Sequence, residues 1–139
     1  MAAVVLTNAE VTLKPSGGAE VDLSDHVRAV TINWTAEVQD VTAMNANAVR
    51  SKKAGLIDWN MEIEFVQDYA ASSVDETIYA LVGQDDTTVE VEPVSGSAPQ
   101  YEGTGIVTSY NPVAGSIGEA MMASITIEGS GALTRGAAD

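Results

Sequence analysis

Residues 56–65 read LIDWNMEIEF and alternate between apolar and polar side chains with a period of two. Successive side chains of a β-strand point to opposite faces, so this alternation predicts a half-buried strand. One face is expected to lie in the core and carries Ile57, Trp59, Met61, Ile63 and Phe65. The other face carries Asp58, Asn60, Glu62 and Glu64. Its row of three carboxylates calls for a functional explanation.

The rest of the chain is typical of a mainly β protein. Residues 26–34 (HVRAVTINW) also alternate and place Val30, Ile32 and Trp34 on one face, which we expect in the core. Further strands are expected at 9–14, 37–43, 87–94, 101–110 and 120–129, because turn residues separate these segments. Regularly spaced short strands of this kind are typical of a sandwich or barrel.

One helix is predicted over residues 72–83 (SSVDETIYALVG). Ser73 and Glu76 have the spacing of a capping box, and Gly83 suits the position after the last helical turn. The sequence therefore predicts a single domain over residues 1–139. We expect a β-sandwich or barrel of about seven or eight strands with one flanking α-helix.

Two segments are expected outside the regular elements. Residues 44–55 (MNANAVRSKKAG) lack alternation and are interpreted as a long connecting loop. The loop holds Arg50, Lys52 and Lys53, which are half of the six basic residues of the chain. Residues 130–139 are expected to form a mobile C-terminal tail.

Composition narrows the function classes. The formal net charge is −14, from 20 acidic and 6 basic residues. Such a chain has few groups that neutralise phosphates, so tight binding of nucleic acids or anionic membranes is disfavoured. No cysteine is present, which excludes disulfides and thiolate metal sites. The N-terminus lacks the basic region of a signal peptide, and no stretch approaches the length of a membrane span.

Enzyme chemistry is not indicated. The single histidine, His26, has no evident partner for nucleophilic catalysis. The glycines of EGTGIV (102–107) lack the strand-then-helix context of a dinucleotide loop and are expected to mark a bulge or a close backbone approach. Glycoside hydrolysis is disfavoured because it needs aromatic platforms and aromatic residues are only 5% of the chain; the carboxylates considered for it are Asp58/Glu62/Glu64, Asp85/Asp86 and Glu90/Glu92. Asp85–Asp86 lacks the spacing of an EF-hand calcium loop and is expected to be a solvated acidic loop. We expect no cofactor and no metal.

Three stretches together resemble the tail tube protein, or major tail protein, of long-tailed bacteriophages. They are VDLSDHVRAVTI (21–32), GLIDWNMEIEFVQDYAASSVDETIYALVG (55–83) and YEGTGIVTSYNPVAGSIGEAMMASITIEGSGALTRG (101–136). The resemblance covers most of the chain in the expected order. It implies a β-sandwich flanked by a helix, hexameric rings that stack into a hollow tube, and an inner barrel through which the genome passes without specific binding.

This resemblance suggests uses for the charged residues. The acids could line the channel, where like charge keeps DNA from adhering, or face a neighbouring subunit or the outside; the candidates are Asp58, Glu62, Glu64, Glu90 and Glu92. The basic loop with Arg50, Lys52 and Lys53 could contact an adjacent ring, or remain a solvated loop. Tape-measure, tail-terminator and tail-tip proteins are the further partners that the resemblance implies.

The resemblance also implies a place in the virion tail, after synthesis and assembly in the cytoplasm of a bacterial host. Other readings remain open. The chain could be a tail-completion or decoration protein of a virion, or a non-viral immunoglobulin-like binding module. Self-assembly separates a tube protein from all of these.

Overall fold

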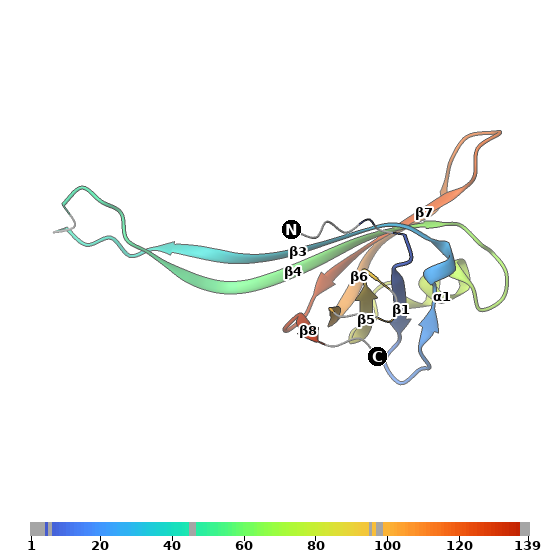
Figure 1. Cartoon of the computed structure of the whole chain (residues 1–139), viewed down its shortest axis with the longest axis horizontal. Helices are drawn as coiled ribbons and strands as arrows, with labels where there is room; N and C mark the ends of the chain where they lie inside the picture. Colours follow the sequence, from blue (N-terminus) through green and yellow to red (C-terminus); the bar gives the residue numbers. More distant parts are fainter. Residues whose placement is uncertain (1–4, 6, 45–46, 95, 97–98, 137–139) are drawn as a thin grey trace.

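The computed structural model describes residues 5, 7–44, 47–94, 96 and 99–136. It contains eight strands, one α-helix and one short 3-10 helix (Figure 1). The elements in chain order are β1 (Glu10–Lys14), β2 (Val21–Asp22), η1 (Ser24–His26), β3 (Val27–Asp40), β4 (Lys52–Val66), α1 (Val74–Leu81), β5 (Thr87–Glu92), β6 (Gln100–Ala114), β7 (Met122–Gly129) and β8 (Thr134–Gly136). The mainly β fold with one helix is therefore confirmed. No helix within the described ranges is long and apolar enough to cross a membrane.

The strands form one antiparallel sheet with the order β2-β1-β5-β6-β7-β4-β3, and β8 pairs with β6. The long strand β6 joins two halves of this sheet. Its residues Tyr101–Gly105 pair with β5, and its residues from Gly105 to Ala114 pair with β7. Core side chains from both halves and from α1 belong to a single cluster. The sheet therefore closes around its own apolar face together with the helix.

Trp59 is the largest side chain in the core and is 1% exposed. Its indole lies against two glycines. A Cβ added at Gly129 would stand 2.3 Å from the indole Cε2, and one added at Gly103 would stand 2.5 Å from the indole Cζ2. The neighbouring Gly105 approaches the carbonyl oxygen of Glu128 equally closely, at 2.5 Å from the added Cβ. The glycines of EGTGIV therefore mark a close backbone approach, one of the two expectations for them.

The expected core is found in part. Trp59, Met61, Ile63 and Phe65 of β4 are buried, and Val30 and Ile32 of β3 pack against their cluster half-buried. The expectation is wrong for Trp34 and Ile57, which are 52% and 57% exposed. Both lie on the same face as the buried residues, but the body of the protein ends at Trp59. Alternation predicts the face and not how far a neighbouring layer extends.

The strand boundaries also differ from expectation. Residues 26–34 and 37–43 do not form two strands, because β3 runs without interruption from Val27 to Asp40. The loop expected over 44–55 is shorter, since β4 begins at Lys52 and pairs there with Asp40. Residues 45–46 lie outside the described part of the chain.

The C-terminal segment differs from the predicted mobile tail as well. Thr134–Gly136 form β8, which pairs with Gln100–Glu102 of β6. Leu133 packs against the core just before this strand. Residues 137–139 of the predicted tail lie outside the described residues.

Candidate assembly surfaces

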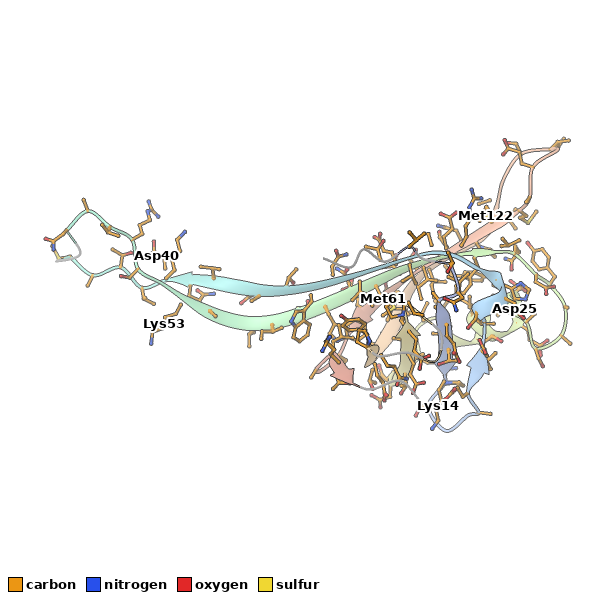
Figure 2. All side chains as sticks on the ribbon, viewed as in Figure 1. Lys14, Asp25, Asp40, Lys53, Met61 and Met122 are labelled. Carbon is orange, nitrogen blue, oxygen red and sulfur yellow. The ribbon has the colours of Figure 1, made fainter. Side chains whose placement is uncertain are left out.

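A long β-hairpin projects from the body (Figure 1). We call residues 34–58 the arm; it comprises the distal parts of β3 and β4 and their connection. Trp34, Val38, Leu56 and Ile57 on the arm are 52%, 62%, 76% and 57% exposed. Figure 2 shows the arm extending well past the side chains of the body, with Asp40 and Lys53 near its far end. Trp34, Val38 and Ile57 continue the apolar face of the core outward, and no other described residue covers them.

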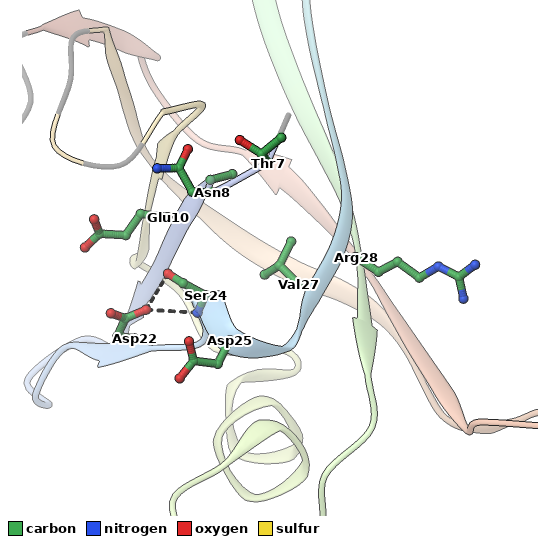
Figure 3. Close-up of a pocket in the computed structure, with 9 residues that line it drawn as sticks. Thr7, Asn8, Glu10, Asp22, Ser24, Asp25, Val27 and Arg28 are labelled. Carbon is green, nitrogen blue, oxygen red and sulfur yellow. Dashed lines mark hydrogen bonds between the residues drawn. The ribbon is translucent and has the colours of Figure 1, made fainter. Parts of the chain in front are cut away.

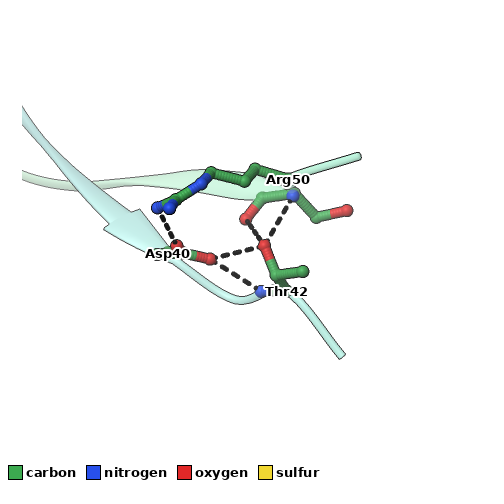
Figure 4. Close-up of polar contacts among 4 residues, drawn as sticks. Asp40, Thr42 and Arg50 are labelled. Atoms are coloured by element: carbon green, nitrogen blue, oxygen red, sulfur yellow. Dashed lines mark hydrogen bonds and ion pairs between the residues drawn. The ribbon is translucent and has the colours of Figure 1, made fainter. Parts of the chain in front are cut away.

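The distal end of the arm is fixed by a polar network (Figure 4). Asp40 accepts hydrogen bonds from the backbone N–H and the hydroxyl of Thr42, and Arg50 Nη1 lies 3.2 Å from Asp40 Oδ2. The Ser51 N–H donates to Thr42 Oγ1 at 2.8 Å. The bonds from Thr42, and then the one from Arg50, hold the pKa of the Asp40 carboxyl below its usual value. Because the ion pair is exposed, it orders the turn more than it stabilises the fold.

The three basic residues of the expected loop all lie on the arm. Arg50 is in the connection, whereas Lys52 and Lys53 belong to β4 and pair in register with Asp40 and Gln39. Basic charge is thus concentrated at the far end of the arm. Its position is compatible with a contact to another subunit.

The sheet of β3, β4, β7 and the second half of β6 presents a polar face opposite the core. Asp58, Glu62 and Glu64 alternate on β4 with the buried residues. Their register partners on this face are small side chains, most of them hydroxyls: Thr35 for Asp58, Thr31 and Thr126 for Glu62, and Ala29 and Ser124 for Glu64. No Lys or Arg occurs at residues 29–36, 58–66, 105–114 or 122–129. We call this surface the polar face; it is acidic and built mainly of small side chains, and Arg28 of β3 reaches Met122 at its edge.

Glu90 and Glu92 do not join the polar face. They lie on β5, which β6 and β7 separate from β4. Glu92 is 5% exposed and accepts the backbone N–H of Gly96 at 3.1 Å, while Glu90 accepts the hydroxyl of Thr12 at 3.2 Å. The expectation of a second lumen-facing acidic strand is therefore wrong for Glu92. It could not have been rejected from alternation alone, because TTVEVE reads like a strand with one solvated face.

The polar face has an unpaired strand edge on each side. Within the described residues, β3 has a strand neighbour only on its β4 side. Beyond Gly105, β6 pairs with β7 on one side, and on the other side a single bridge joins Val107 to Val82. Pro112 lies in this part of β6, and proline suits an edge because it lacks an N–H. Sequence reasoning could not locate these edges, since they depend on strand order.

The polar contacts around His26 do not form a catalytic triad. His26 Nε2 lies 3.3 Å from Ser73 Oγ and 3.5 Å from Asp68 Oδ2, and Ser73 donates to the same carboxylate at 2.8 Å. Both partners thus face one ring nitrogen, so Asp68 cannot orient the ring from the opposite side as a triad requires. The Ala70 N–H and then the Ser73 hydroxyl lower the pKa of Asp68. This cluster anchors the start of α1.

A polar cavity of about 560 Å³ lies beside β1 and η1 (Figure 3). Asp22 accepts the N–H of Ser24 at 2.9 Å and also its hydroxyl, and the Ser24 Oγ accepts the N–H of Val11 at 2.9 Å. These bonds fix η1 to β1. In the described part of the chain, no group of three or more His, Cys, Asp or Glu residues is arranged to hold a metal ion.

No protein-family model and no curated protein matches this chain. Solved structures do match. A chain in the C6-symmetric tail of an empty gene transfer agent particle has a TM-score of 0.76 at 23% identity, over 95% of this chain and 98% of that chain. A chain in the virion of the native gene transfer agent particle has a TM-score of 0.75 at 20% identity, over 97% and 100%.

A third similar structure comes from the six-fold symmetrised baseplate of the anti-feeding prophage. Its TM-score is 0.68 at 9% identity, over 97% of this chain and 96% of that chain. In all three cases nearly the whole of both chains is aligned. This protein therefore shares its fold with these tail, virion and baseplate chains.

Proposed function

We propose that this protein is a structural subunit of a phage-type tail tube, forming hexameric rings that stack into a hollow conduit for a genome. The observation that carries the proposal is the polar face with its two unpaired edges. In a ring, the β3 edge of one copy would pair with the free β6 edge of the next. The unpaired N–H and C=O groups of both edges would then be satisfied by symmetry.

Such a ring would turn the polar face toward the lumen. Six copies would surround the channel with hydroxyl groups and with Asp58, Glu62 and Glu64. Arg28 at the edge is the one base that the described residues bring to this face, against three acids, so little would bind phosphates and DNA would slide and not adhere. The C6 symmetry of the gene transfer agent tail supports six copies in the ring.

The arm would serve stacking. Its exposed apolar side chains would be buried in such a contact, and its far end carries Arg50, Lys52 and Lys53 on a protein of net charge −14. Opposite charge on an adjacent ring would orient the contact, while burial of the apolar side chains would supply affinity. Tape-measure, terminator and tip proteins would complete such a tail in the virion.

The similarity to a baseplate chain supports a second candidate, a ring at the end of a tail that does not polymerise. Negative-stain electron microscopy across a concentration series separates the two. A tube subunit is expected to give hollow tubes or stacked six-fold rings, whereas a baseplate or completion protein gives single rings. Monomers at every concentration, with and without a purified tail-tip complex as initiator, would refute the proposal and favour a binding module.

A further inference from the structure

A second, smaller protrusion lies at the end of the body remote from the arm (Figure 1). It is the connection between β6 and β7, and we call residues 113–119 the tip. Val113 and Ile117 are 72% and 106% exposed, so the tip offers apolar side chains that no other described part of the chain covers. Glu119, also exposed, follows two residues after Ile117.

The base of the tip is held firmly. The Tyr69 hydroxyl donates to the carbonyl oxygen of Pro112 at 2.8 Å and lies 3.0 Å from the Met121 sulfur. The amide of Gln67 donates to the same carbonyl oxygen at 2.7 Å. These contacts fix both strands where they leave the body. The tip therefore has a defined direction before it meets any partner.

An apolar groove of about 590 Å³ lies where the arm joins the body. It is lined by Ile32 and Trp34 of β3, Tyr101 of β6, Leu133 and Arg135. Arg135 is exposed and makes no ion pair with any residue that the structure describes. The groove thus combines an apolar floor with one basic group at its wall.

We propose that the tip of one copy docks into the groove of another copy. The β8 strand beside the groove and the tip lie at opposite ends of the body (Figure 1), so one chain cannot fill its own groove. A contact between two different patches is heterologous, so it links successive copies into a closed ring or an open filament. The proposal rests on the proposed self-assembly and deepens it by naming the contacting residues.

Charge favours the tip over the arm, which also projects and has exposed apolar side chains. The tip carries Glu119, which complements Arg135, whereas the far end of the arm carries three bases that Arg135 would repel. Ile117 would fill the groove against Trp34 and Leu133. Large buried apolar residues beside an oppositely charged pair form the kind of contact that dominates interfaces.

Cysteine cross-linking tests the contact directly, because the chain has no cysteine of its own. The double variant Ile117→Cys/Leu133→Cys is assembled, oxidised mildly and run on a non-reducing gel. We expect a ladder of covalent multimers, because each copy would join the next. The matched control is Met44→Cys/Leu133→Cys, which places the thiol on the exposed arm instead. A ladder from the control and none from the tip variant would make the arm the occupant and overturn the proposal.

A charge swap gives an independent reading. Glu119→Arg and Arg135→Glu are each expected to raise the concentration needed for assembly at least tenfold, and the double variant to restore it. If both single variants assemble as readily as the wild type, and no cross-link forms between positions 117 and 133, this contact is overturned and the proposed function still stands. Absence of assembly in the wild type itself would overturn the proposed function, and this contact with it.

Discussion

The packing of Trp59 on two glycines makes Gly129→Ala a sharp test of the core. The added Cβ would lie 2.3 Å from the indole Cε2, whereas carbon atoms in contact prefer about 3.5–4.0 Å. The indole ring would therefore have to shift by about 1 Å inside a closely packed core. Overpacking of this kind costs about 1–3 kcal/mol. For a chain of this size, that corresponds to a fall in Tm of about 4–12 °C.

Gly136→Ala is the matched control. An added Cβ at Gly136 meets nothing within 4 Å, and the residue also lies in a strand of the same sheet. Its substitution should change the free energy of unfolding by less than about 0.5 kcal/mol. Both variants are unfolded with urea at a concentration where the protein is monomeric, and circular dichroism follows the transition.

A double-mutant cycle then identifies the indole as the cause. Trp59→Leu alone should destabilise through lost packing, and Trp59→Ala by about 3–5 kcal/mol. In Gly129→Ala/Trp59→Leu the clash is gone, so the loss should be smaller than the sum of the two single losses by about 1 kcal/mol or more. The reasoning is refuted if Gly129→Ala is as stable as Gly136→Ala, or if the cycle is additive.

Three further predictions concern charge and protonation. Reversal of the basic arm, with Arg50→Glu, Lys52→Glu and Lys53→Glu together, should leave the monomer folded but prevent stacking; unchanged tubes by electron microscopy would contradict the role of the arm. The pKa of Asp68 is lowered in the folded state, so the ionised carboxylate stabilises the fold above the ordinary value of 3.8, and this contribution is lost as the pH falls through the folded pKa. In Asp68→Asn, the Tm should not show this decrease at acid pH. Burial, and then a hydrogen bond to a carboxylate, raise the pKa of Tyr110 from 10.0 to about 12. The neutral Tyr110 hydroxyl therefore contributes fully to stability below pH 10.0, and this contribution is lost as the pH rises toward about 12. In Tyr110→Phe, the Tm should fall less over this alkaline range than in the wild type.

The stretch from Trp59 to Phe65 shows what the sequence could predict. Its alternation identifies a strand, its two faces and its buried members, and all of these are local properties. Ile57 follows the same alternation and is nevertheless exposed, because exposure depends on where the opposing layer ends. That boundary is set by residues far away in the chain, and a single strand carries no record of it.

The same limit applies to the other misplaced residues. Lys52 and Lys53 looked like loop because their own segment lacks alternation, yet pairing with β3 makes them strand. Glu92 looked solvated until the fold placed it at 5% exposure, with the backbone N–H of Gly96 as a hydrogen-bond donor. In each case a tertiary partner decides the outcome, as is common for strands.

The hairpin form of the arm has a consequence for the kinetics of association. A disordered loop would have to lose the conformational entropy of each residue when it docks, at about 1–2 kcal/mol per residue. In β3 and β4 the backbone is already paired from Asp40 and Lys52 inward, so that loss has occurred during folding. Docking then restricts only the orientation of a stiff lever. We therefore expect a subunit that joins its neighbour as a preorganised body, at a rate that reflects encounter and not coupled folding.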